Sequence, residues 1–355
     1  MIDNQNIVES YKKHTRKKFL FILASFFLLL LLVFISISIG SYPIELMKVI
    51  ETVIYGGDDV ISNVIWQIRI PRVLTAIVAG MGLAVSGVAM QSILRNPLGS
   101  PFTLGISHTS AFGAAFAIVV LGAGSIQSSS IDAVIQNNPY IVTICAFLFS
   151  LVATLIIIIL AKYKGATPES MILTGVALGS LALAGTTAIE YFADDVQLSS
   201  IIFWTFGDLG RVSWNELLII TGVVLPSIAY FFYNIWNYNS LSSGEESAKS
   251  LGTHIERVRI GGMLVASLVT ALIVSYVGII GFIGLVVPHI ARKIIGGDAR
   301  FLLPASCIVG SILLLSSDTI ARTVISPVIL PVGILTSFIG APLFIYLVIR
   351  GRQYW

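Results

Sequence analysis

The side chains that could carry chemistry are few in this 355-residue sequence, and their spacing points away from catalysis. The four histidines never fall at the spacing of metal ligands, and the two cysteines lie inside apolar segments. The sequence therefore predicts neither a metal site nor a disulfide framework. These residues are His14, His108, His254, His289, Cys145 and Cys307.

Residues 244–250, GEESAKS, come closest to a nucleotide-binding motif. A phosphate-binding loop follows the pattern G-x-x-x-x-G-K-[ST], because its backbone N–H groups and its lysine surround the phosphates. Ala248 stands where the second glycine is required, so we expect no ATP site in this chain. The sequence also lacks the G-x-S-x-G turn of serine hydrolases. It therefore predicts neither a catalytic residue nor a cofactor.

Composition decides the class of protein. Charged residues make up 11% of the chain and hydrophobic residues 56%, and the mean hydropathy is +0.94. A typical soluble protein has roughly 25% charged residues, and so few charges could not cover a soluble fold. We therefore predict an all-α polytopic membrane protein. The net charge of +3 is too small to indicate a nucleic-acid partner.

Apolar segments divide the chain into about ten predicted transmembrane helices, since about 20 apolar residues cross a membrane. Residues 260–291 carry no acidic or basic side chain and are too long for one helix, so we expect two helices joined by a tight turn near Gly281. Residues 19–39 follow a basic run but exceed the roughly 7–15 apolar residues of a signal peptide, so they are read as a span. The remaining spans are residues 73–93, 101–121, 140–161, 170–189, 217–234, 301–320 and 332–349.

Basic residues set the expected orientation, because Lys and Arg accumulate in cytoplasmic loops. Sixteen of the 21 lie on the side of the N-terminus, which predicts cytoplasmic tails at residues 1–18 and 351–355 around a membrane domain at residues 19–350. The other side holds an expected amphipathic helix at residues 44–54, a Ser-rich loop at residues 122–139, and five basic residues. These five are Lys48, Arg69, Arg72, Arg211 and Arg322.

Ionisable side chains are scarce in the middle of the predicted spans, and Glu190, Asp318 and Arg322 lie near span ends. A transporter that drives itself with protons or sodium usually carries such groups at mid-membrane. A stand-alone secondary transporter is therefore the weaker alternative. Small residues spaced by four predict close helix packing, at Ala76, Gly80 and Ala84 and at Gly175 and Gly179.

Three long blocks carry a resemblance to a known family. They are RIPRVLTAIVAGMGLAVSGVAMQSILRNPLGSP from residue 69, VGIIGFIGLVVPHIARKIIGGDAR from residue 277, and DTIARTVISPVILPVGILTSFIGAPLFIYLVIR from residue 318. These blocks resemble the permease subunits of type II ABC importers for iron–siderophore complexes, haem and cobalamin. The resemblance implies ten helices, a second permease subunit, identical or not, two ATP-binding subunits that hold ATP and Mg, and an extracytoplasmic substrate-binding protein.

The resemblance also implies a role for three of the basic residues on the outer side. In the family, the R-x-x-R before the second helix and the Arg of D-x-x-A-R face outward and form salt bridges with the binding protein. These positions are Arg69, Arg72 and Arg322. A guanidinium fork matches a carboxylate bidentately, which suits such docking. The alternative for Arg322 is an ion pair with Asp318, four residues earlier on the same helix.

Residues 237–259 resemble the family's cytoplasmic coupling segment, two short helices that contact an ATPase subunit. Ser243, followed by two glutamates, predicts a helix start, and Leu251-Gly252 a stop. We expect ATPase contacts at Glu246, Ala248, Leu251 and Gly252. The alternative is a solvated amphipathic loop without a partner.

The resemblance places the translocation path along the fifth helix and the segment that follows it. Its lining would be weakly polar, with hydroxyl groups from Thr174, Ser180, Thr186 and Thr187. The alternative for each hydroxyl is a hydrogen bond to the backbone of its own helix. The gate would lie near Thr167, Pro168 and Glu169. Cobalamin permeases of the family have small hydroxyl residues there, so the gate chemistry does not carry over.

One position departs from the family pattern: Ile329 stands where a glutamate usually precedes Leu-Pro-Val-Gly. Its effect on cargo or docking does not follow from the sequence. The expected protein is a non-enzymatic permease of the cell membrane, in contact with lipid, that imports an iron chelate by alternating access. Cobalamin or haem is the alternative cargo.

Overall fold

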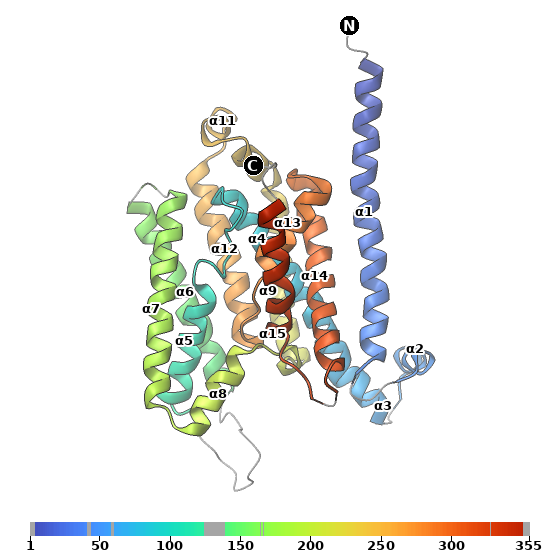
Figure 1. Ribbon diagram of the computed structural model, residues 1–355, viewed down its shortest axis with the longest axis vertical. Coiled ribbons are helices and arrows are strands. Elements are labelled where there is room, and N and C mark those ends of the chain that lie inside the picture. Colours follow the sequence, from blue (N-terminus) through green and yellow to red (C-terminus); the bar gives the residue numbers. More distant parts are fainter. Residues whose placement is uncertain are drawn as a thin grey trace.

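The computed structural model describes residues 4–40, 44–57, 60–123, 139–163, 165, 167–326 and 328–350, and no strand occurs among them. Helices run between two ends of a bundle (Figure 1). The first residues of α1 (Asn4–Ser38) and the last of α15 (Val332–Arg350) lie at the same end as α11 (Glu245–Ser250). This end is called the α11 end. The opposite end holds α8 (Asp195–Thr205) and is called the α8 end.

Seven helices in the described residues are long and apolar enough to cross a membrane. Besides α1 they are α4 (Ile70–Ile93, extended by the residues before it), α6 (Pro139–Tyr163), α7 (Pro168–Phe192), α9 (Trp214–Tyr233), α12 (Ile255–Val277) and α14 (Ala299–Thr323). Three shorter helices stand at other predicted spans: α5 (Ile106–Val119), α13 (Ile283–Ile295) and α15. The number of ten membrane crossings stays a prediction.

The connections contain further short helices. They are α2 (Leu46–Tyr55), α3 (Val60–Asn63), a π-helical turn (Val64–Arg69), a 3-10 turn (Leu209–Arg211) and α10 (Ile235–Ser242). The predicted amphipathic helix at residues 44–54 corresponds to α2. Most of the predicted Ser-rich loop and the tail at residues 351–355 lie outside the described residues.

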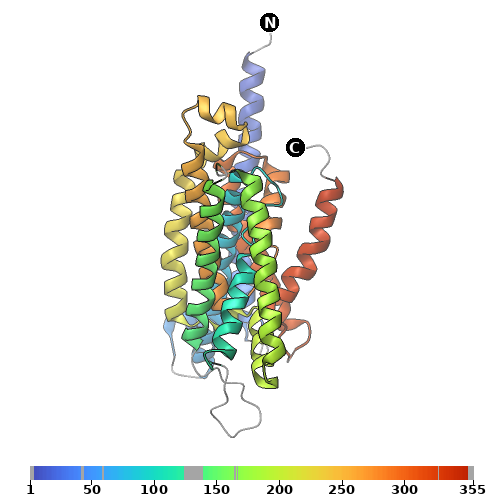
Figure 2. The ribbon, with the colours of Figure 1, turned by 90° about the vertical axis from the view of Figure 1, so that its left-hand side faces the viewer.

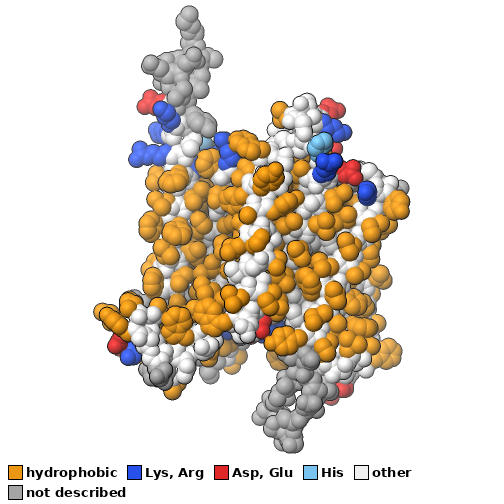
Figure 3. All heavy atoms as spheres, turned by 180° about the vertical axis from the view of Figure 1, so that it is seen from behind, with side chains coloured by type: hydrophobic (Ala, Val, Ile, Leu, Met, Phe, Trp, Pro, Cys, Tyr) orange, Lys and Arg blue, Asp and Glu red, His pale blue; other side chains and the backbone are white. Residues whose placement is uncertain are grey.

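The surface of the bundle has a broad hydrophobic band between charged ends (Figure 3). Phe27 and Leu31 of α1 and Leu173 and Leu181 of α7 are among its exposed side chains. Lipid tails offer no hydrogen bonds, so a membrane-facing surface consists of apolar side chains on helices whose backbone bonds are internal. The prediction of an all-α, multi-pass membrane protein is confirmed.

The helix α4 forms the centre of the bundle and packs against α9, α12, α13 and α14. Close approach depends on glycine: a Cβ atom added to Gly80 would lie 2.5 Å from the carbonyl oxygen of Gly310 in α14. Gly87 meets the backbone of Gly284 in α13 more closely still. The predicted small-residue seam is therefore the contact between α4 and α14, with Ala84 beside Gly310.

Two predicted helix boundaries have clear physical causes. The apolar stretch at residues 260–291 breaks between Val277 and Ile283, where Gly278 adopts a φ of +78° that favours glycine. The predicted span at residues 101–121 forms a helix only from Ile106, because Gly105 has a φ of +77° and the preceding residues form a turn.

Candidate functional site

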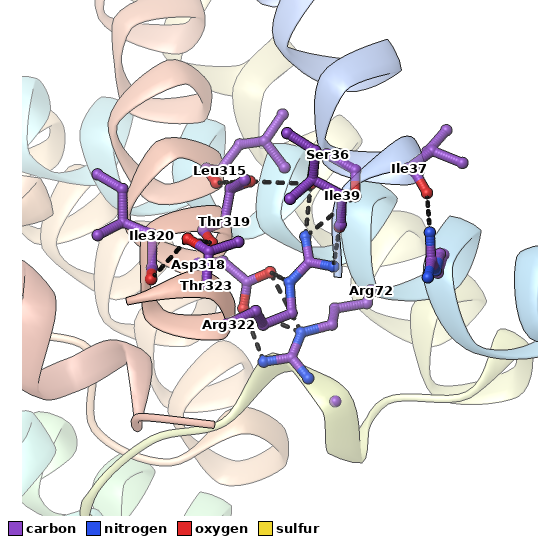
Figure 4. A network of polar contacts seen from close by, with 12 residues as sticks. Ser36, Ile37, Ile39, Arg72, Leu315, Asp318, Thr319, Ile320, Arg322 and Thr323 are labelled. Atoms are coloured by element: carbon purple, nitrogen blue, oxygen red, sulfur yellow. Dashed lines mark hydrogen bonds and ion pairs between the residues drawn. The ribbon is translucent and has the colours of Figure 1, made fainter. Parts of the chain in front are cut away.

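The three arginines predicted to dock a binding protein gather at the α8 end with two aspartates. Arg69, Arg72, Asp208, Asp318 and Arg322 are called the arginine cluster. Arg72 lies in the first turn of α4. Asp318 and Arg322 lie in the last turns of α14. Figure 4 shows Asp318 between the guanidinium groups of Arg72 and Arg322.

Asp318 is the centre of this cluster and is fully buried. Arg72 donates to it bidentately, from Nε to Oδ1 at 3.0 Å and from Nη2 to Oδ1 at 2.8 Å, with Nε also 3.2 Å from Oδ2. The Nε atom of Arg322 lies 3.0 Å from Oδ2 of Asp318. A carboxylate in such a place must be paired, because burial removes the water that would otherwise stabilise its charge.

Asp208 forms the accessible edge of the cluster. It lies on the turn after α8, and one of its carboxylate oxygens is 3.2 Å from Nη2 of Arg72. Its side chain is 41% exposed, whereas the Arg72 side chain is only 9% exposed. The Asp208 contact is therefore the ion pair of Arg72 that solvent or a partner reaches first.

Arg69 and Arg322 bind the end of α1. Arg69 donates to the carbonyl oxygens of Ile37 and Ser38 at 2.5 and 2.9 Å. Arg322 donates to the Ser36 carbonyl at 3.2 Å and to its hydroxyl at 2.7 Å. The last carbonyl groups of a helix lack partners within it and attract cations, so both arginines stabilise the end of α1.

The three arginines predicted to dock a binding protein, Arg69, Arg72 and Arg322, are all buried, and each bonds within the chain. The alternative stated for Arg322, an ion pair with Asp318 on the same helix, is present. A partner carboxylate would therefore have to displace an intramolecular contact.

The predicted coupling segment forms two short helices, α10 and α11, at the α11 end (Figure 2). The predicted start at the two glutamates and the stop before Leu251 match the bounds of α11. Glu246 and Gly252 are exposed, and Leu251 is 71% exposed. Ala248, in contrast, is fully buried in the core, so its side chain does not lie on the outer surface.

An open groove of about 350 Å³ lies along this segment. Trp236 and Leu251 contribute large exposed apolar side chains to it, and the remaining lining is polar. Those polar residues are Asn237, Asn239, Ser240, Ser243 and Thr253.

Charged contacts lie where the segment meets the bundle. A hydrogen bond from Arg259 lowers the pKa of Glu245 at the start of α11, and Arg95 and Lys249 add to the effect. Arg300 donates to Asp298 before α14 and lowers the pKa of that carboxyl to about 2. Both acids are therefore ionised at neutral pH.

The predicted path residues lie along α7. Ser180 and Thr187 are exposed and Thr174 is half-buried. Thr186 is buried and donates its hydroxyl to the Ala182 carbonyl at 2.9 Å, which is the alternative stated for such hydroxyls.

The predicted gate residues form the start of α7. The Thr167 hydroxyl accepts from the Ser170 N–H at 3.3 Å, Pro168 is buried in the first turn, and Glu169 is exposed. Proline and an acidic residue are both favourable in a first helical turn. Each of these three residues thus has a structural role in the helix.

Three residues that make polar contacts in these sites do not stand out in the sequence. Asp208 lies in the turn FGDLGR, and its pairing with Arg72 depends on tertiary contacts. Arg259 counted only as a cytoplasmic charge, and Asn239 only as part of a polar segment. Within the described residues, no group of three metal-ligating side chains gathers.

Comparison with known proteins agrees with this arrangement. Residues 28–350 match the FecCD transport family. A Methanocaldococcus jannaschii protein named as an ABC transporter permease is 52% identical over 345 residues, covering 97% of this chain and 98% of its own. The hemin transport system permease of Yersinia pestis is 35% identical and covers 92% of this chain and 95% of its own.

A solved structure has the same fold. It is described as an inward-facing conformation of an ABC transporter of the metal-chelate type, and it superimposes with a TM-score of 0.79 at 32% identity. It covers 93% of this chain and 98% of the solved chain. The chain therefore belongs to the FecCD transport family and is a multi-pass permease component of an ABC transporter.

Proposed function

We propose that this permease imports an iron chelate by alternating access, driven by ATP hydrolysis on separate subunits. The observation that carries the proposal is a membrane bundle with an exposed, partly apolar segment, α10–α11, at its basic end. The metal-chelate type of the structural relative supports this cargo, and the hemin relative supports haem as the alternative. Cobalamin is the other alternative within the family.

The α10–α11 segment is the proposed contact with an ATP-binding subunit. Leu251 and Trp236 expose large apolar surfaces among the polar side chains of the groove at the α11 end. Glu246 and Gly252 complete the exposed face. Ala248 supports the segment from beneath, since its side chain packs in the core.

The arginine cluster is the proposed contact with a substrate-binding protein. Asp208 is exposed enough to be displaced, and a carboxylate from the binding protein would then accept from Arg72. The buried pair between Arg72 and Asp318 would stay in place, because losing it would leave charges unpaired inside the protein.

The translocation path is proposed to lie along the exposed face of α7, against a second permease subunit. Between exposed apolar side chains such as Leu173 and Leu181, this face carries the small or weakly polar residues Ser180, Ala184 and Thr187. Such a surface offers few strong bonds to a large chelate, which favours release over tight binding. Thr174 lies at its margin.

The test uses the complex that co-purifies with the tagged chain in mild detergent, reconstituted into liposomes. We expect uptake of labelled ferric chelate to depend on ATP, and labelled cobalamin and haem to be taken up more slowly. Uptake without any ATP-binding subunit would instead favour a secondary transporter. Faster uptake of cobalamin or haem than of the ferric chelate would identify that compound as the cargo instead.

A variant tests the ATPase contact within the same assay. Leu251→Arg places a charge in the exposed apolar face and should reduce both stimulated ATP hydrolysis and uptake about tenfold, the effect of losing one strong interface residue. Tyr163→Arg is the matched control, because Tyr163 is another large side chain that is mostly exposed, and it lies at the end of α6, outside the α10–α11 segment. If Leu251→Arg hydrolyses ATP and takes up substrate at the wild-type rates, Leu251 does not contact the ATP-binding subunit.

A further inference from the structure

A single buried side chain joins three helices at the α11 end. Arg259, in the first turns of α12, is 3% exposed. Its Nε atom donates to the carbonyl oxygen of Ile93 at 3.0 Å, and its Nη2 atom donates to Oε1 of Glu245 at 2.8 Å. Ile93 is the last residue of α4, and Glu245 is the first residue of α11. Arg259 therefore links the α10–α11 segment to the central helix of the bundle.

The chemistry of this contact requires arginine. A guanidinium group is planar and presents several N–H donors in fixed directions, whereas a lysine ammonium is a single point charge on a flexible stem. The Ile93 carbonyl is one of the helix-terminal acceptors that α4 cannot satisfy by itself. Only a forked donor reaches this carbonyl and the carboxylate of Glu245 from one buried position.

Asn239 makes a second link between the segment and the bundle. Its side-chain NH₂ donates to Oδ1 of Asp298 at 3.0 Å, and its side-chain oxygen accepts from the backbone N–H of Ala299 at 2.8 Å. Ala299 is the first residue of α14. The α10–α11 segment is thus bonded to α4 through Arg259 and to α14 through Asn239.

The two helices reached by these links also contact each other along their length. Gly80 of α4 and Gly310 of α14 meet backbone to backbone, so no flexible side chain separates the helices there. Near the α8 end, Arg72 of α4 and Asp318 of α14 form the buried ion pair. A displacement at the segment would therefore move α4 and α14 together as far as the arginine cluster.

We propose that Arg259 is the positioning residue that transmits displacement of the α10–α11 segment to α4 and α14, with Asn239 as the second attachment. This rests on the proposed function, in which an ATP-binding subunit moves that segment. Loss of Arg259 would leave the ATPase contact surface in place but disconnect it from the helices that rearrange during transport.

The experiment measures uptake per ATP hydrolysed in the reconstituted complex for Arg259→Gln, Arg259→Lys and Glu245→Gln. We expect this ratio to fall about threefold to tenfold in Arg259→Gln, the usual range for coupling contacts. Arg259→Lys should fall in between, because a lysine ammonium donates from one nitrogen and does not reproduce the two separate donor positions of Nε and Nη2. The ATPase subunit should still co-purify, since Leu251 and Glu246 are unchanged.

Arg257→Gln is the matched control, because Arg257 lies two residues away on the same helix and is exposed. Glu245→Gln weakens the same contact from its more exposed side, so it tests the proposal even if the Arg259 variants misfold. The Glu245 side chain is 37% exposed. The Glu245→Gln variant should lower the ratio about twofold with normal assembly. A general structural defect would reduce hydrolysis and uptake equally and leave their ratio unchanged, which would contradict the proposal.

Leu251→Arg separates the two proposals. If it uncouples the complex while Arg259→Lys and Glu245→Gln keep the wild-type ratio, the segment contacts the ATPase but Arg259 does not transmit its motion. If Leu251→Arg itself couples normally, the contact assignment fails and the Arg259 proposal fails with it.

Discussion

Replacement of Asp318 by Asn would test whether the arginine cluster holds the α8 end together. The side chains are nearly isosteric, so the change removes one negative charge and little volume. Asp318 is fully buried, accepts two hydrogen bonds from Arg72 at 3.0 Å or less, and pairs with Arg322 at 3.0 Å. In the variant, two guanidinium groups would face each other across a neutral amide.

The expected cost follows from burial. Removing one partner of a buried ion pair typically costs about 3–5 kcal/mol, because the remaining charge stays in a medium of low polarity. The exposed Asp208 still neutralises part of the Arg72 charge, so the lower half of this range, about 3 kcal/mol, is expected. Arg322 keeps its bonds to Ser36, and α1 should therefore stay attached.

Thermal unfolding of the purified chain in detergent would measure this effect. Asp318→Asn should unfold at a clearly lower temperature than the wild type. Asp195→Asn is the control, because it removes the same charge from an exposed position in the first turn of α8. A double variant, Asp318→Asn with Arg72→Gln, should recover part of the loss, because it removes one of the two facing cations and leaves the bonds of Arg322 to Ser36 in place.

Equal unfolding temperatures for Asp318→Asn and the wild type would refute this reasoning. That result would mean that water or a rearrangement of Arg72 compensates the lost carboxylate, and the cluster would not be a stabilising element. Failure of the double variant to recover stability would show that repulsion between the two arginines is not the cause.

Two further predictions concern the helix contacts and the docking surface. Gly87→Ala should lower the unfolding temperature, because its Cβ would overlap the Gly284 backbone and overpacking costs about 1–3 kcal/mol. The control, Gly222→Ala, has open space around it and should have no such effect. Equal unfolding temperatures of the two variants would contradict the close contact. Asp208→Asn should let the binding protein stimulate ATP hydrolysis at a lower concentration, because Arg72 loses its accessible intramolecular partner, and an unchanged concentration dependence would argue against docking through Arg72.

Seven of the predicted spans coincide with membrane-length helices among the described residues, because hydropathy and helix punctuation are local properties. The break after Val277 followed from glycines in an apolar run, and the bounds of α11 followed from Ser243, the two glutamates and Gly252. The helix α8 was missed, although Asp194 and Gln197 form a capping box that marks its start. Its few turns lack the long apolar stretch that identifies a membrane span.

The environment of the predicted docking residues could not be predicted in the same way. Arg72 looks exposed in the sequence because a charge beside a span is usually solvated. Its burial depends on Asp318, which is 246 residues away, and on Asp208 in a separate turn. Tertiary contacts of this kind leave no periodic signal, and the same holds for the links that Arg259 makes to Ile93 and Glu245.

The large sequence separation within the arginine cluster has a consequence for biogenesis. Arg72 is synthesised 246 residues before Asp318, and Ser36 lies 286 residues before its partner Arg322. Chains are made from the N-terminus, and their early segments enter the membrane before later ones exist. The first helices therefore insert without the carboxylate and the guanidinium group that later bind them, and the end of α1 becomes fixed only after α14 arrives. A chain truncated before α14 would leave Arg72 without its buried partner Asp318.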